Sequence, residues 1–165
     1  ITISPTFSWS VVFTQDSIYN TSVTQPRIVI DTNVLIVALR SQRGASALLL
    51  SKLGADLFEA HISIPLVLEY EEVLLRQRNE LGLSADEVSE LIDSLCALAV
   101  RHEQIYFKWR PSLKDARDEH ILELAVKGQC SAIVTYNVRD FSGVERFGIR
   151  AINPQTFLRE IGVIS

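Results

Sequence analysis

The chain has 165 residues, 47% of them hydrophobic, which suits one domain with a buried core and argues against a second domain. Its 16 basic and 20 acidic residues give a net charge of −4. This charge excludes a broadly basic surface that binds nucleic acid by charge alone, although it leaves a local groove open. No apolar run approaches the roughly 20 residues of a membrane span, so we expect no membrane association.

The remaining composition indicates an ordinary cytoplasmic domain. Cys96 and Cys130 have no CxxC spacing and no nearby histidine cluster, which favours free thiols over a disulfide or a zinc site. Residues 1–26 lack the pattern of a secretion signal, and we expect them to be an N-terminal extension or an added leader. Residues 27–165 are expected to form the single domain.

From residue 27 onward, short β-branched runs alternate with longer helical stretches, which is typical of an α/β domain with a mainly parallel sheet. The expected strands are residues 27–30, 61–64, 131–135 and 149–152, with a strand or extended segment at 102–108. The expected helices are residues 32–39, 45–53, 66–78, 85–100, 115–129 and one that begins at Pro154. Ser84 and Glu87 have capping-box spacing, Pro65 suits a first helical turn, and Gly128 is a helix stop.

Acidic and amide residues follow three of the apolar strands. Asp31 comes directly after the first strand, Glu69 lies near the start of the helix after the second, and Thr135, Asn137 and Asp140 follow the third. Ligands of open parallel sheets bind beyond the carboxyl ends of the strands, so we expect these side chains to face one cleft. Asp31 is also in position to be the N-cap of the next helix.

The helix at 115–129 supplies a further carboxylate. With about 100° between successive residues, its apolar positions centre on Asp118, which therefore points toward the core side. Asp115 is the expected N-cap, and His120 is placed near the exposed side, which argues against a catalytic histidine. In the helix at 66–78, periodicity does not separate Glu69 from Glu71, and Glu69 is favoured only because it is nearest the strand end.

A cluster of carboxylates has consequences for binding. Like charges at short range raise one another's pKa unless a cation lies among them. Oxygen ligands without histidine or cysteine select a hard ion, so we expect Mg²⁺ or Mn²⁺ at this site.

Four motifs carry a resemblance to a known family: VIDTNVLI, PLVLEYEEVLLR, DARDEHILELA and AIVTYNVRDF. Together they resemble the PIN domain nucleases, in particular the compact VapC-like ribonuclease toxins of toxin–antitoxin modules. The resemblance covers residues 27–152 and implies a three-layer α/β/α sandwich with a mainly parallel central sheet. It also implies the catalytic and metal-binding residues, which are Asp31, Glu69, Asp118 and Asp140.

The resemblance extends to supporting residues. Asn33 and Thr135 are similar to the polar residues that support the family's site. Asn137 stands where many members have an aspartate, so whether Asn137 or Asp140 faces the metal is left open. Among the basic residues, Arg43 and Arg139 are the preferred candidates to line an RNA groove.

The implied activity is metal-dependent endonucleolytic hydrolysis of RNA phosphodiester bonds, with a small antitoxin protein and a second copy of the chain as candidate partners. One alternative is a non-catalytic PIN fold that binds RNA or protein, which would lack a central carboxylate. Another is a metal-dependent phosphatase or phosphotransferase of a different α/β family, which would use the first aspartate as nucleophile and place a lysine near the phosphate.

Overall fold

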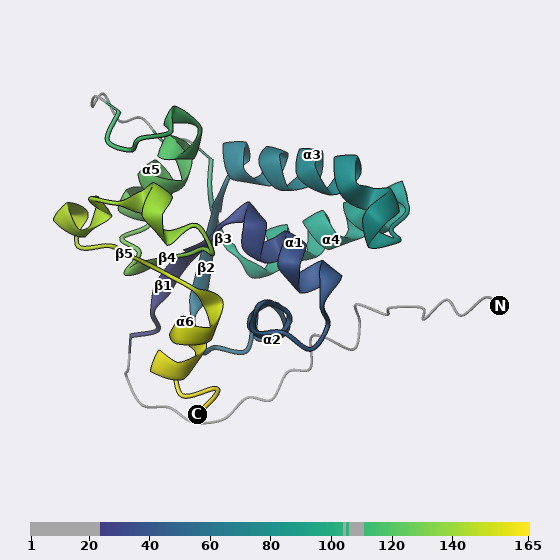
Figure 1. The fold of residues 1–165 in the computed structure, drawn as a ribbon, viewed down its shortest axis with the longest axis horizontal. Coiled ribbons are helices and arrows are strands. Elements are labelled where there is room, and N and C mark those ends of the chain that lie inside the picture. Colours follow the sequence, from purple (N-terminus) through teal and green to yellow (C-terminus); the bar gives the residue numbers. More distant parts are fainter. Residues whose placement is uncertain (1–23, 104, 106–110) are drawn as a thin grey trace.

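A computed structural model describes residues 24–103, 105 and 111–165 of the chain (Figure 1). It contains one five-stranded sheet, formed by β1 (Arg27–Ile30), β2 (Glu59–Ser63), β3 (Val100–His102), β4 (Ala132–Val134) and β5 (Arg150–Ile152). The strand order is β3-β2-β1-β4-β5, and each of the four pairings is parallel. The predicted α/β class with a mainly parallel sheet is confirmed.

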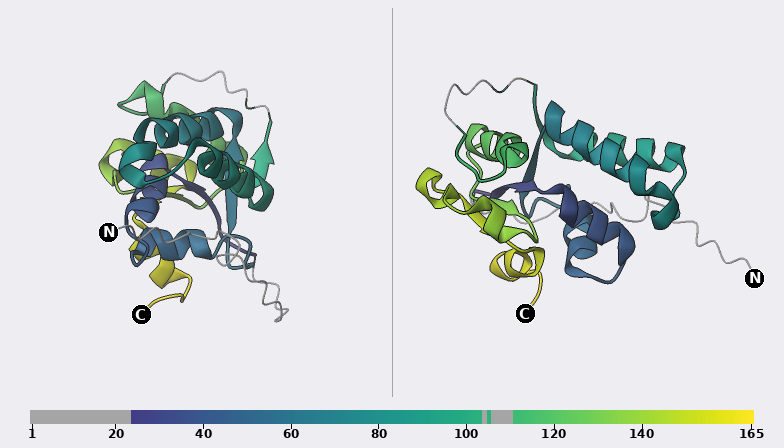
Figure 2. Two further views of the ribbon diagram at one scale, coloured as in Figure 1. Left: turned by 90° about the vertical axis from the view of Figure 1, so that its right-hand side faces the viewer. Right: turned by 45° about the horizontal axis from the view of Figure 1, so that its top comes forward.

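The described residues form six α-helices: α1 (Thr32–Arg40), α2 (Ala45–Ser51), α3 (Ile64–Leu81), α4 (Ala85–Leu98), α5 (Glu119–Lys127) and α6 (Pro154–Glu160). Helices α1 to α4 lie on one side of the sheet, and α5 lies on the other (Figures 1 and 2). Helix α1 packs on α2 and α3, whereas α5 contacts β1, β2 and β4. The three layers of the expected sandwich are therefore present.

Strand β1 lies at the centre of the sheet between the two helical layers. Ile28 and Val29 have no solvent exposure, and Ile30 is almost completely buried. This burial on both faces explains why the strand is continuously apolar rather than alternating. Because all its neighbours run parallel, the carboxyl end of β1 lies at the same edge as those of β2 and β4.

The boundary between β2 and α3 differs from the predicted one. Ile64 begins the helix instead of ending the strand, because the Ser63 side chain caps the helix by accepting from the backbone N–H of Leu66. Pro65 lies in the first turn, where its missing N–H costs nothing, as expected. The helix continues to Gly82, whose φ of 69° is the left-handed conformation that ends many helices.

Three other predicted helices are shorter than expected, whereas α3 is longer. The helix at 85–100 has its expected capping box but ends at Leu98, and Val100 pairs with His61 in the sheet. The helix at 115–129 divides into a 3-10 turn, Ala116–Asp118, and α5, which ends at Lys127. Helix α2 ends at Ser51 rather than residue 53, and 3-10 turns at Val138–Phe141 and Val144–Phe147 were not predicted.

Two expectations fall largely outside the described residues. The extension or leader at 1–26 includes residues 1–23, and the segment at 102–108 includes residues 104 and 106–108. Over the described ranges, no single helix is both long and apolar enough to cross a membrane. Helices α1 and α2 together reach that length and composition, but the chain bends by 103° between them.

Candidate active site

Asp31 lies at the junction of β1 and α1 with its side chain held by two neighbours. Its Oδ2 accepts hydrogen bonds from Asn33 Nδ2 at 2.7 Å and from Thr135 Oγ1 at 2.6 Å. Asp31 occupies the N-cap position, yet within the described residues its side chain makes no capping hydrogen bond. Asn33 and Thr135 thus hold the carboxylate, and only 8% of the residue is exposed at the sheet edge.

Asn33 and Thr135, the two predicted supporting residues, connect the β1 junction to the end of β4. Thr135 has no solvent exposure, and its Oγ1 accepts from Asn33 Nδ2 at 3.1 Å and from the Asn137 backbone N–H at 3.0 Å. Asn33 Oδ1 in turn accepts from the backbone N–H of Tyr136 at 3.1 Å. The Asp-Thr-Asn sequence after β1 thus fixes both its own carboxylate and the loop after β4.

Glu69 lies near the start of α3 and contacts two other helices. Its Oε1 accepts from Thr32 Oγ1 at 2.6 Å, and its Oε2 lies 2.9 Å from His120 Nε2. The nearby His120 ring, above all, lowers the pKa of Glu69, while burial acts in the opposite direction and Thr32 lowers it further. The carboxylate is therefore held in its charged form.

His120 was expected near the exposed side of its helix, and this expectation was wrong. Only 21% of its side chain is exposed, because its ring turns from α5 toward Glu69 on α3. Burial acts to lower the pKa of His120, but the facing Glu69 carboxylate raises it overall. The sequence pattern argued against a catalytic role for His120, yet this histidine lies within the acidic site.

Asp118 ends the 3-10 turn before α5 and is partly buried. Its pKa is raised to about 6, first by burial and then by the charges of Asp31, Asp115, Asp140 and Glu69, in that order. The same repulsion between carboxylates acts on Asp31, whose pKa is raised by burial, lowered by its Thr135 hydrogen bond and raised by Glu69. The four predicted acidic residues thus lie within electrostatic reach of one another.

A cleft of about 570 Å³ opens in front of these groups. Glu69, Asp118, Asn137 and Asp140 line it, while Asp31 lies behind them and acts on Asp118 through its charge. Both Asn137 and Asp140 are exposed to this cleft, so the structure does not choose between them. Glu71 is not on the cleft wall, which agrees with the preference for Glu69.

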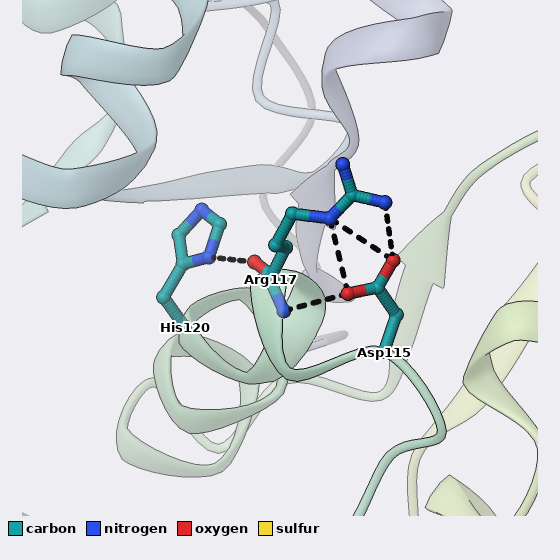
Figure 3. A network of polar contacts seen from close by, with 3 residues as sticks. All are labelled: Asp115, Arg117 and His120. Atoms are coloured by element: carbon teal, nitrogen blue, oxygen red, sulfur yellow. Dashed lines mark hydrogen bonds and ion pairs between the residues drawn. The ribbon is translucent and has the colours of Figure 1, made fainter.

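The cationic side chains of the cleft are not the two that were preferred from the sequence. Arg76 and Arg117, rather than Arg43 and Arg139, line it. Arg117 is bound to Asp115, whose carboxylate accepts from the Arg117 backbone N–H at 2.9 Å and from its guanidinium at 2.7 and 3.1 Å (Figure 3). The hydrogen bonds from Arg117 lower the pKa of Asp115 to about 2. Asp115 is thus an N-cap, as expected, and also an ion-pair partner.

The turn that carries Asp118 is fixed from both sides. His120 Nδ1 lies 2.7 Å from the backbone carbonyl of Arg117, and Figure 3 shows the His120 ring and the Arg117 side chain rising from the same turn. On the other side, the buried Glu119 carboxylate accepts from the backbone N–H groups of Ser112 and Leu113. The apolar periodicity of the sequence does not mark Glu119 as the anchor of the preceding loop.

The donor chemistry of the site fits a hard cation. As the side chains lie, no three His, Cys, Asp or Glu residues of the described ranges form a ready metal-binding group. However, the cleft collects carboxylate and amide oxygens, and the charges of the neighbouring carboxylates, after burial, raise the pKa of Asp118. Carboxylate oxygens are the ligands of Mg²⁺ and Mn²⁺, and a divalent ion would relieve this repulsion.

The comparison with known proteins agrees with this geometry. No curated protein matches the chain. The sequence does match the PIN domain family over residues 27–139, a span that contains Asp31, Glu69 and Asp118. PIN domains are generally nucleases that act on RNA and use divalent metal ions. Because the match covers more than half of its length, the chain belongs to the PIN domain family.

Proposed function

We propose that this protein is a Mg²⁺- or Mn²⁺-dependent endoribonuclease whose active site contains Asp31, Glu69, Asp118 and Asp140. The observation that carries the proposal is the convergence of these four carboxylates, in which the charges of the other three act together on Asp118. Such a concentration of unbalanced negative charge lowers stability, and perturbed carboxylates in a cleft are typical of functional sites. The site lies at the carboxyl ends of parallel strands, where α/β proteins bind ligands.

The acidic residues have two roles in the proposed hydrolysis, metal binding and orientation of the attacking water. Asp31, Asp118 and Asp140 supply the oxygen ligands for the cation, and Asn33 with Thr135 holds the Asp31 carboxylate in place. A divalent ion bound there neutralises charge on the phosphate and lowers the pKa of water. Glu69 is held charged beside this site and is suited to orient the attacking water by accepting a hydrogen bond.

Arg76 and Arg117 are the candidate contacts for the RNA backbone. Both line the cleft, and both already pair with carboxylates, Arg76 with Glu72 at 3.4 Å and Arg117 with Asp115 at 2.7 Å. The long, exposed Arg76 pair is weak, so a phosphate can compete for that guanidinium, whereas Arg117 is bound more firmly by its several contacts with Asp115. Two such contacts provide a local electrostatic attraction for RNA despite the net charge of −4.

The test is cleavage of a labelled single-stranded RNA by the full chain. We expect cleavage with Mg²⁺ or Mn²⁺ and none with EDTA, because the carboxylates alone repel the phosphate. Asp31→Asn and Asp118→Asn should each abolish cleavage while circular dichroism shows an unchanged fold. Cleavage that persists with EDTA and in both variants would refute the nuclease assignment.

Each alternative predicts a different arrangement of residues. A non-catalytic PIN fold would lack one of the central carboxylates, whereas all of them lie together here. A phosphatase with a covalent aspartate would need a lysine near the phosphate, and among the described residues the cleft wall includes arginines but not lysine.

We further propose that the protein is a cytoplasmic, VapC-like toxin formed by residues 27–165, preceded by an extension at 1–26. The compactness of the domain supports this. A small antitoxin protein and a second copy of the chain are its proposed partners. Expression should arrest growth, and co-expression of a small neighbouring gene product should relieve the arrest. Normal growth on expression of the active enzyme would count against the toxin role.

A further inference from the structure

His120 contacts two fixed groups with its two ring nitrogens. Nε2 lies 2.9 Å from Glu69 Oε2, and Nδ1 lies 2.7 Å from the carbonyl oxygen of Arg117. A carbonyl oxygen can only accept a hydrogen bond, so Nδ1 carries the hydrogen of that contact. The ring is thereby anchored to the same turn that presents Asp118.

The Glu69 carboxylate is engaged on both of its oxygens. Thr32, the first residue of α1, donates to Oε1 at 2.6 Å, while His120 faces Oε2. Three helices therefore meet at this carboxylate, α1 through Thr32, α3 through Glu69 and α5 through His120. Because each oxygen has its own contact, the Glu69 carboxylate cannot rotate toward a cation without breaking at least one of the two contacts.

Asp31, in contrast, has both side-chain donors on a single oxygen, Oδ2. Asp118 and Asp140 line the cleft, and Asp140 is exposed. Glu69 is thus the acidic residue with a side-chain contact on each of its two oxygens. Asp31 is held through Oδ2 alone, which leaves its Oδ1 without a side-chain donor among the described residues.

We propose that His120 is a positioning residue which, with Thr32, holds Glu69 beside the cation site and out of direct coordination. Asp31, Asp118 and Asp140 are then the direct ligands, and Glu69 acts on the attacking water. This inference rests on the proposed nuclease function and refines it, since it assigns different roles to residues of equal charge. It also gives a role to a histidine for which the sequence indicated none.

The inference is tested by measuring metal binding and cleavage separately. Mn²⁺ affinity is measured by calorimetry, without RNA, for the wild type, Glu69→Gln, His120→Leu, His120→Gln and Asp118→Asn. Glu69→Gln and His120→Leu should leave the Mn²⁺ Kd within about threefold of the wild-type value. Asp118→Asn should weaken binding by about tenfold or more, because it removes a charged ligand.

Cleavage kinetics then test the positioning role. His120→Leu should lower kcat by about 10- to 100-fold, as is usual for residues that orient an active-site group. KM for RNA should stay nearly unchanged, because His120 does not touch the substrate. His120→Gln, whose amide can donate to Glu69, should recover much of the lost kcat. Adding His120→Leu to Glu69→Gln should cause little further loss, because the two residues act through one contact.

Each contrary outcome has a distinct meaning. If Glu69→Gln weakens Mn²⁺ binding as much as Asp118→Asn does, Glu69 is a direct ligand and the inference is wrong, although the nuclease function stands. If His120→Leu and His120→Gln both retain the wild-type kcat, His120 does not position Glu69. If the wild type neither binds Mn²⁺ nor cleaves RNA, the proposed function fails and the inference fails with it.

Discussion

Replacing Asp118 by asparagine should make the metal-free protein more stable at neutral pH. Its carboxylate has a pKa of about 6, raised from 3.8 by burial and by the neighbouring carboxylates. A raised pKa means that the charged form destabilises the folded state, and asparagine removes that charge with almost no change in shape. The same substitution should abolish RNA cleavage.

The size of the effect follows from the pKa difference. About two pH units correspond to about 3 kcal/mol for a group fully shielded from solvent. Asp118 is only partly buried, so screening by water reduces the expected gain to about 1 kcal/mol.

The pH dependence has a definite direction. Above about pH 6, Asp118 is charged in both the folded and unfolded states, and the full gain from asparagine is present. Between about pH 6 and the ordinary value of 3.8, the folded wild type binds its proton first and regains stability. The advantage of Asp118→Asn should therefore shrink over this interval and vanish below it.

Urea denaturation in EDTA measures this gain, at about pH 7.5 and again at about pH 4. Asp115→Asn is the matched control. Arg117 lowers the pKa of Asp115, which means that the charged carboxylate stabilises the folded state, so replacing Asp115 should lower stability instead. Added Mg²⁺ should stabilise the wild type more than Asp118→Asn, since only the wild type retains the full set of ligands. Equal or reduced stability of Asp118→Asn at neutral pH in EDTA would refute the reasoning.

Other substitutions test the packing around the site. Thr135→Val should lower the free energy of unfolding by about 2 kcal/mol or more, because it removes the hydrogen bond to the buried Asp31 carboxylate, whereas Thr135→Ser should lose much less. Gly128→Ala should cost about 1 to 3 kcal/mol, because its Cβ would lie 2.5 Å from His61 Nδ1; a loss below about 0.5 kcal/mol would contradict this packing. Burial, and then the charge of His102, lowers the pKa of His61, so the unfolded chain binds a proton at this histidine more readily than the folded protein does. Stability should therefore fall as the pH drops below 6.5, the ordinary pKa of histidine. His61→Gln, compared by thermal unfolding, should flatten that dependence, and an unchanged pH profile would exclude His61 as its source.

The sequence was sufficient to predict the central strand and its carboxylate. Residues 27–30 are apolar at every position except the first, as a strand buried on both faces requires, and Asp31 breaks that run at its end. The spacing of Asn33 from Asp31 is local, so its supporting role could be inferred from the motif. The contact of Thr135 with Asp31 spans 104 residues and follows only once β1 and β4 are known to be neighbours.

His120 could not be placed correctly because a helical wheel assumes one buried face. Helix α5 packs on the sheet with one face and approaches α3 with another, so a polar residue outside the apolar stripe becomes buried. The role of Glu119 could not be predicted from the sequence for a related reason. Its partners are two backbone N–H groups of a loop, and such a contact leaves no pattern in the side-chain sequence.

The central claim is that the acidic cluster performs metal-dependent RNA cleavage. The most direct measurement is the cleavage rate of one labelled single-stranded RNA in Mg²⁺ by the wild type and by Asp118→Asn, with folding of both checked in the same samples. We predict that Asp118→Asn is at least as stable in EDTA as the wild type and cleaves at least about 100-fold more slowly. Equal cleavage rates for the two folded proteins would contradict the claim.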